Sequence, residues 1–85
     1  MYSFKPRWKE ELVCETPHAD FVIEITMGEL HVYFPTQERW LSLVPECLHS
    51  EYNQIIQELE NWCRKQNIPF TCDFQAWVNI EKLKT

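Results

Sequence analysis

The sequence of 85 residues contains a single glycine, Gly28. Phosphate-binding loops, dinucleotide-binding fingerprints and the nucleophile elbow of hydrolases each need at least two glycines at a fixed spacing. None of these motifs is present, so the enzyme classes that depend on them are excluded.

Short-spaced cysteine pairs are also missing. Zinc ribbons and fingers bind their metal through such pairs, but the four cysteines of this chain lie far apart and form no Cys-x-x-Cys motif. We therefore expect no metal or other cofactor. We expect reduced thiols at Cys14, Cys47, Cys63 and Cys72.

Targeting signals and long apolar runs are absent as well. The first nine residues contain no apolar stretch of the kind found in signal peptides, and no run approaches the ~20 apolar residues of a membrane span. No Asn-x-Ser/Thr acceptor for glycosylation occurs. These features predict a cytoplasmic protein that does not bind membranes.

Basic residues are scarce in the middle of the chain. Between Glu10 and Cys63 there are eleven acidic residues and one base, Arg39, which gives this stretch a net charge of −10. Such a field repels nucleic-acid phosphates and attracts cationic partners. We therefore expect no direct nucleic-acid binding and favour a partner with a basic surface.

Apolar and aromatic residues are plentiful, at 45% and 14% of the chain. A chain of this length buries roughly 60–65% of the surface that its unfolded form exposes, and large aromatic rings help to fill so small a core. We predict one globular domain spanning residues 1–85, in which at least one of the four tryptophans stays partly exposed.

The strongest local pattern is the alternation of apolar residues over 21–34, which predicts a β-hairpin. Gly28 suits the first central position of a type II′ turn, which needs a positive φ. In the matching register six apolar side chains share one face of the hairpin, while Glu24 faces Tyr33 and Thr26 faces His31 on the other. The six are Ile23, Ile25, Met27, Leu30, Val32 and Phe34.

A helical stripe of apolar residues runs from about 46 to 66 and predicts the main amphipathic helix. Asn67 and Pro69 provide a stop signal after it. Before it, Thr36 is placed to cap a short helical turn that contains Trp40. Trp62 belongs to the apolar stripe and is expected in the core.

Two segments permit more than one structure. Residues 70–80 alternate like a strand, although Asp73 could cap a helix in the second part, so we expect a strand or a strand followed by a helix. Residues 8–15 favour an edge strand beside the hairpin. Together the patterns predict an α+β fold, with a small antiparallel sheet packed against one main helix.

No group of residues forms a recognisable catalytic set. Cys47 lies two residues before His49, a spacing that points the two side chains in different directions on a helix. Glu46 and His49 form one Glu-x-x-His pair, whereas di-iron bundles use two pairs on four helices. We predict no catalytic residues.

We expect a non-enzymatic protein-binding module, an acidic inhibitor or immunity-type partner of a basic protein. The residues expected to bind the partner are Glu24, His31 and Tyr33 on the hairpin and Glu51 and Glu58 on the main helix. The alternative is a small-ligand or catalytic domain with a pocket around Glu24, His31 and Tyr33 at a homodimer interface.

Overall fold

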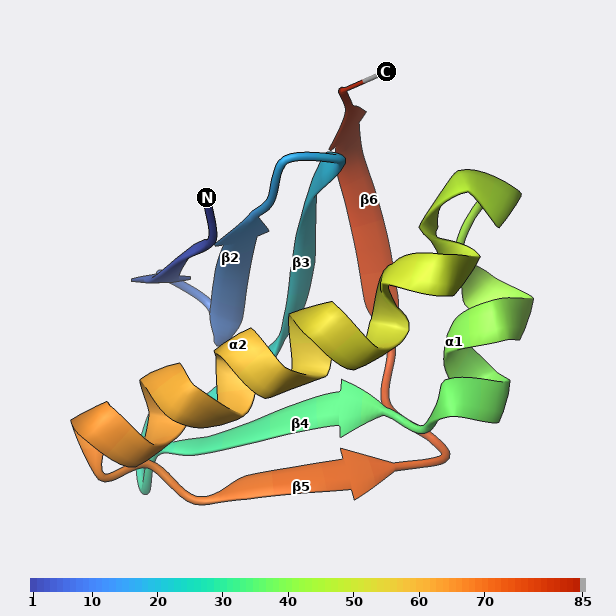
Figure 1. Ribbon diagram of the computed structural model, residues 1–85. Coiled ribbons are helices and arrows are strands. Elements are labelled where there is room, and N and C mark those ends of the chain that lie inside the picture. Colours follow the sequence, from blue (N-terminus) through green and yellow to red (C-terminus); the bar gives the residue numbers. More distant parts are fainter. Residues whose placement is uncertain (85) are drawn as a thin grey trace.

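The computed structural model describes residues 1–84 and shows one layer of helices packed on one mixed β-sheet (Figure 1). Its elements are β1 (Ser3–Arg7), β2 (Glu11–Glu15), β3 (Ala19–Thr26), β4 (His31–Pro35), α1 (Gln37–Leu43), the 3-10 segment η1 (Glu46–Glu51), α2 (Tyr52–Gln66), β5 (Phe70–Asp73) and β6 (Val78–Leu83). The predicted α+β class is confirmed.

Strand β3 is the centre of the sheet. One of its edges pairs with β2, and β1 follows beyond β2. Its other edge is shared, because residues 19–23 pair with β6 while Glu24–Thr26 pair with β4. Strand β5 then lies parallel to β4, so every pairing of the six strands is antiparallel except this one.

The predicted hairpin register is confirmed along the pairing of β3 with β4. Glu24 lies opposite Tyr33, Ile25 opposite Val32, and Thr26 opposite His31. The expected pair of Ile23 with Phe34 is replaced, because Ile23 lies opposite Val78 of β6. Of the six apolar side chains, four are fully buried, namely Ile23, Ile25, Val32 and Phe34.

The prediction for the turn of this hairpin is wrong. Gly28 does not have a positive φ, so the turn is not type II′. Strand β3 ends at Thr26, β4 begins at His31, and the four residues between them form the turn. The turn is held by a 2.6 Å hydrogen bond from Thr26 Oγ1 to the Glu29 carbonyl. Met27 is half-buried and Leu30 is exposed, because neither belongs to a strand.

The main helical segment covers residues 46–66 as expected, but its first part is 3-10 and only α2 is α-helical. The buried face of α2 consists of Tyr52, Ile55, Leu59 and Cys63, and it packs on the sheet (Figure 1). Asn67 ends the helix in the left-handed conformation with φ 57°. Trp62 is half-buried and contacts Phe4, with ring centroids 5.9 Å apart.

The two ambiguous segments are both strands. Residues 11–15 form β2, but this strand is internal, because β1 pairs with its outer side. The helix considered after Asp73 does not form. Instead Asp73 Oδ1 accepts a 2.8 Å hydrogen bond from Gln75 N in a tight turn, and β6 then pairs with β3.

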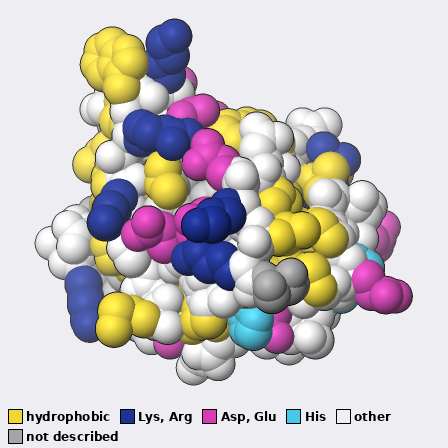
Figure 2. Space-filling model, turned by 90° about the horizontal axis from the view of Figure 1, so that it is seen from above, with side chains coloured by type: hydrophobic (Ala, Val, Ile, Leu, Met, Phe, Trp, Pro, Cys, Tyr) yellow, Lys and Arg dark blue, Asp and Glu magenta, His cyan; other side chains and the backbone are white. Residues whose placement is uncertain are grey.

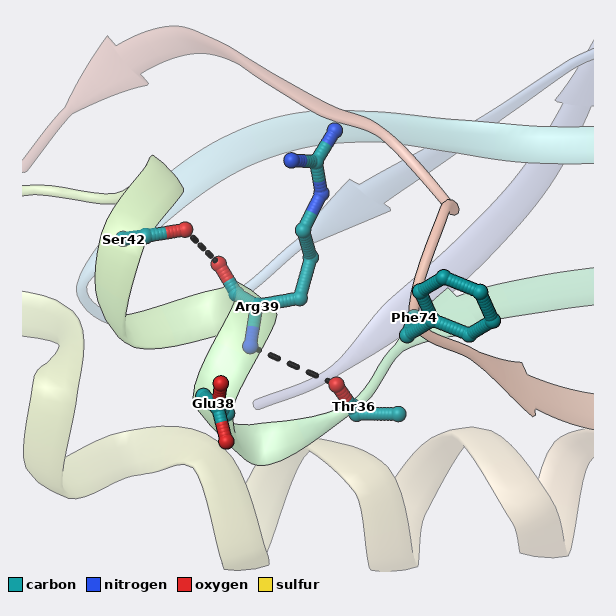
Figure 3. Close-up of a pocket in the computed structure, with 5 residues that line it drawn as sticks. All are labelled: Thr36, Glu38, Arg39, Ser42 and Phe74. Atoms are coloured by element: carbon teal, nitrogen blue, oxygen red, sulfur yellow. Dashed lines mark hydrogen bonds between the residues drawn. The ribbon is translucent and has the colours of Figure 1, made fainter.

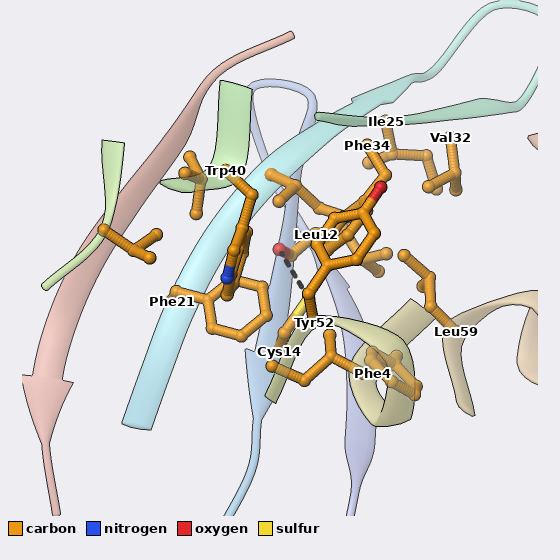
Figure 4. Packing of buried hydrophobic residues seen from close by; sticks show 14 of the residues in the cluster. Phe4, Leu12, Cys14, Phe21, Ile25, Val32, Phe34, Trp40, Tyr52 and Leu59 are labelled. Atoms are coloured by element: carbon orange, nitrogen blue, oxygen red, sulfur yellow. Dashed lines mark hydrogen bonds between the residues drawn. The ribbon is translucent and has the colours of Figure 1, made fainter. Parts of the chain in front are cut away.

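The core lies between α2 and the sheet, and Trp40 of α1 is its largest fully buried side chain (Figure 4). Thr36 caps α1 as predicted, by accepting a hydrogen bond from Arg39 N. The Trp40 ring contacts Phe21 edge-on and Phe34 at a tilt. Trp8 is 82% exposed at the β1–β2 turn, which confirms that one tryptophan lies outside the core.

Candidate functional site

The sheet face that points away from α2 carries a row of polar side chains. The strand registers place Arg7, Glu11, Glu24, Tyr33 and Thr71 next to one another across β1, β2, β3, β4 and β5. All five are exposed or half-buried. The neighbours of Glu24 and Tyr33 along each strand point the other way, into the core.

Three of the predicted residues come together in this row. Glu24 lies opposite Tyr33, and the ring of His31 stacks on that of Tyr33 with centroids 4.4 Å apart and planes inclined by 14°. His31 Nε2 is 2.7 Å from Thr71 Oγ1 of β5. The stack and this contact fix the Tyr33 ring between β3 and β5.

Beside Tyr33 the surface is hollowed, with a volume of about 370 Å³. We call this the acidic hollow, because it contains two carboxylates, those of Glu24 and Asp73. It is lined by Glu24, Thr26, Tyr33, Asp73, Gln75 and Ala76. Asp73 is not among the partner-binding residues predicted from the sequence. Its place here depends on the parallel pairing of β5 with β4, for which no local sequence signal exists.

The charges along the row are unevenly balanced. Arg7 Nη2 lies 2.8 Å from carboxylate oxygens of both Glu11 and Glu81, and hydrogen bonds to these two residues raise the pKa of the Arg7 guanidinium. Glu24 lies directly opposite Glu11. Among residues 1–84, neither Glu24 nor Asp73 has an ion-pair partner. The acidic hollow is therefore a site of uncompensated negative charge.

Elsewhere the bases near the two chain ends pair with acids of the central segment. Lys5 lies 3.4 Å from Glu15, and Lys84 lies 2.7 Å from Asp20. Figure 2 shows a face of the molecule on which basic and acidic side chains lie next to one another. These ion pairs offset the negative charge of the central segment at Glu15 and Asp20, whereas no ion pair of the described residues offsets it at the acidic hollow.

The other two predicted residues, Glu51 and Glu58, lie on the helical side and are not brought to the acidic hollow. Glu51 is 3.0 Å from His18 Nε2, and Glu58 accepts a 3.0 Å hydrogen bond from Gln54. Burial raises the pKa of Tyr2, and the negative charges of Glu51 and Glu58 add to this rise. Glu58 and Tyr2 line the same surface hollow, and both carboxylates lie on the helical side of the sheet, opposite to Glu24.

The side chains considered for other chemistry have different roles. His49 Nε2 is 3.1 Å from the Val44 carbonyl, which ties His49 to the segment before η1. Burial raises the pKa of Cys14, Cys63 and Cys72, so these groups are thiols at neutral pH. Within residues 1–84, no three His, Cys, Asp or Glu side chains are grouped in a way that could hold a metal ion.

A second and larger hollow lies between α1 and the β5–β6 turn, with a volume of about 510 Å³. We call it the arginine hollow. It is lined by Thr36, Glu38, Arg39, Ser42 and Phe74 (Figure 3). Phe74 is 71% exposed, and Arg39 is the only base of the acidic central segment. Neither residue is among the site residues predicted from the sequence.

Comparisons with protein-family models, with characterised proteins and with solved structures found no match to this chain. Among the described residues, no helix has both the length and the apolar character that crossing a bilayer requires.

Proposed function

We propose that this protein is a non-enzymatic protein-binding module, an inhibitor or immunity-type partner whose acidic hollow receives a lysine or arginine side chain of a basic protein. The observation that carries the proposal is the placement of two unpaired carboxylates, Glu24 and Asp73, beside the face-stacked ring of Tyr33 in one surface hollow.

A cation in this hollow would relieve an unfavourable arrangement. Like charges directly opposite one another on neighbouring strands are destabilising, and Glu24 lies opposite Glu11. Glu11 is paired with Arg7, which it shares with Glu81, whereas Glu24 has no ion-pair partner among residues 1–84. A bound lysine or arginine would supply the missing positive charge and contact the Tyr33 ring, to which cations are attracted.

The volume and shape of the hollow suit a side chain. At about 370 Å³ it is at the lower end of the range for ligand pockets, and it opens directly to the surface of the sheet. His31 would act as a positioning residue, because its ring stacks on Tyr33 and its Nε2 contacts Thr71. Polar contacts of this kind orient a partner once an aromatic ring anchors it.

Glu51 and Glu58 would contribute at longer range. They lie on the helical side, so they would not contact a partner that is bound at the acidic hollow. Their charges add to the overall charge of −5, which attracts a basic protein during its approach. Neutralising them should lower the association rate and its dependence on salt, and leave the dissociation rate unchanged.

The acidic hollow can be tested with tetralysine as the probe, by following backbone amide shifts in an NMR titration. We expect saturable shifts at Glu24, Tyr33 and Asp73 that weaken as salt is added. The double variant Glu24→Gln, Asp73→Asn should bind at least about fivefold more weakly, because charged hydrogen bonds are lost. Asp73→Asn retains a side-chain oxygen that can accept the hydrogen bond from Gln75 N, so the turn should persist.

The matched control is Glu29→Gln, Glu60→Gln, which removes the same charge from two exposed acids outside the hollow. This control should keep most of the affinity for tetralysine. If both double variants weaken binding equally, only net charge matters and the acidic hollow is not the site.

A second candidate is a homodimer in which another copy completes the pocket around Glu24, His31 and Tyr33 for a small ligand. It is favoured by the edge strand β5, which pairs only with β4 in the described chain and exposes Thr71 next to Tyr33. Light scattering combined with size exclusion separates the two candidates, because the binding module needs no second copy. A strict monomer at high concentration would contradict the homodimer.

A further inference from the structure

We propose that the arginine hollow is a second binding site, one that takes a small monocarboxylate carrying an apolar or aromatic group. The site differs from the acidic hollow in its charge and in its lining residues, so it does not depend on the proposed protein partner. Its volume of about 510 Å³ lies within the range of small-molecule pockets.

Arg39 provides the anion-binding group. Its Nε donates a 3.2 Å hydrogen bond to the Ala76 carbonyl, which holds the side chain against the β5–β6 turn. Within residues 1–84 its Nη1 and Nη2 atoms have no hydrogen-bond or ion-pair partner. With Nε occupied, the two terminal nitrogens remain as a fork of N–H donors, the geometry that matches the two oxygens of a carboxylate.

Arg39 is the one half-buried base among residues 1–84, and it has no carboxylate partner. The other bases of the described chain are all exposed to solvent, whether they pair with a carboxylate, as Lys5, Arg7 and Lys84 do, or form no ion pair, as is the case for Lys9, Arg64, Lys65 and Lys82. Arg39 is part-buried and adjoins Glu38, which lines the same hollow, yet the two side chains form no ion pair. A positive charge held in place without a counter-ion in an acidic protein favours a bound anion.

Phe74 provides the apolar contact. Its ring is 71% exposed, although such rings are usually buried. The turn that carries it is fixed by two hydrogen bonds to Asp73, from Gln75 N at 2.8 Å and from Ala76 N at 3.1 Å. Ala76 also holds Arg39, so one short turn positions both the ring and the guanidinium at the hollow (Figure 3).

The remaining charges select the type of anion. Glu38 places a negative charge at the hollow, and the whole chain has a charge of −5. Repulsion grows with the charge of the ligand, so a monocarboxylate is favoured over phosphate or an acidic macromolecule. The exposed ring then favours a carboxylate that carries a flat apolar group, because burial of both surfaces is favourable.

The test is an NMR titration with 3-phenylpropionate, followed at the Arg39 side-chain Nε–Hε and the Phe74 backbone amide. We expect saturable shifts at both groups and at least about tenfold weaker binding of the neutral amide of the same acid, of acetate and of inorganic phosphate. Equal binding of the neutral amide or of phosphate would overturn the proposal, as would the absence of saturable shifts.

Four single variants test the named residues. Arg39→Lys keeps the charge but loses the fork and should weaken binding about tenfold, while Arg64→Lys on α2 should have no effect. Phe74→Ala should weaken binding about fivefold, while Leu41→Ala, which removes another exposed apolar side chain, should have no effect.

A fifth variant tests the charge selection. Glu38→Gln should tighten binding about threefold by removing the repulsion. If Arg39→Lys and Phe74→Ala both bind like the unmodified protein, the hollow is not the site. All of the substituted side chains except Arg39 are exposed, so these variants should fold.

Discussion

The indole Nε1 of Trp40 donates a 3.0 Å hydrogen bond to the backbone carbonyl of Leu48. Both residues are fully buried, and the bond joins α1 to the 3-10 segment η1 that leads into α2. A buried indole N–H needs such a partner, because an unsatisfied polar group in the core is costly. Trp40 therefore fills the core and also fixes the path of the chain between the helices.

Trp40→Phe should consequently lower the free energy of unfolding by about 2–3 kcal/mol. The phenyl ring leaves a cavity and the Leu48 carbonyl loses its donor, and each effect costs about 1 kcal/mol or more. Urea unfolding measures the loss. Trp8→Phe is the matched control, because Trp8 is 82% exposed and its replacement should change stability by less than about 0.5 kcal/mol. Equal effects of the two substitutions would contradict the role of Trp40.

Alkaline pH should destabilise the protein through its buried thiols. Burial raises the pKa of Cys63 from 9.0 to about 11 and raises that of Cys14 well above 9.0. The unfolded chain loses these protons near pH 9 while the folded protein keeps them. The stability contributed by the neutral thiols is therefore fully present below pH 9 and is lost as the pH rises towards 11. Over this interval each thiol lowers the free energy of unfolding by up to about 1.4 kcal/mol for every pH unit.

Urea unfolding at about pH 8 and about pH 10.5 tests this dependence. Cys63→Ala should reduce the slope, whereas Cys47→Ser should leave it unchanged, because Cys47 is exposed. A free energy of unfolding that stays constant across this interval would contradict the effect of thiol burial.

Gly28→Ala should leave the hairpin intact and stabilise the protein by a few tenths of a kcal/mol, up to about 1 kcal/mol. Gly28 does not have a positive φ, and a Cβ atom placed on it would meet no other atom within 4 Å. The substitution therefore mainly removes conformational freedom from the unfolded chain. Thermal unfolding measures the shift, and a loss of more than about 1 kcal/mol would indicate that the turn requires glycine.

The β1–β2 turn differs in this respect, because two residues without glycine's freedom adopt the left-handed region there. Lys9 has φ 75° and Glu10 has φ 62°. The left-handed conformation costs about 1–2 kcal/mol for an ordinary residue, so Lys9→Gly should stabilise the protein by about 0.5–1 kcal/mol.

Glu10→Gly provides the contrast, because Glu10 Oε2 accepts a 3.3 Å hydrogen bond from Met27 N. Its loss should offset the relief of backbone strain, which leaves a smaller gain or none. A destabilising Lys9→Gly, measured by urea unfolding, would contradict the account of strain at this turn.

Local sequence patterns predict much of this fold but not the assembly of the sheet. The alternation around Gly28 gives the pairing of Glu24 with Tyr33, and Asn67 correctly marks the end of α2. These features depend on neighbours in the sequence. The pairing of β6 with β3 and the parallel contact of β5 with β4 join distant segments, and no local propensity encodes them.

The two hollows likewise combine residues that local sequence patterns bring together with residues that come from distant segments. Glu24, His31 and Tyr33 could be predicted as one cluster because a single hairpin carries all of them. Asp73 and Thr71 reach that cluster only through β5, and Arg39 reaches Ala76 only through the β5–β6 turn. The contribution of residues 71–76 to each hollow therefore depends on tertiary structure and could not be predicted from local patterns.

The central place of β3 has a consequence for the synthesis of the chain. One edge of β3 can pair with β2 early, but part of its other edge must wait for β6, which the ribosome makes only after both helices and β5. Until then the nascent sheet has an open edge with unpaired backbone groups, which are prone to associate with other chains. Strand pairing should therefore be completed late, and a chain truncated before residue 78 should aggregate rather than fold.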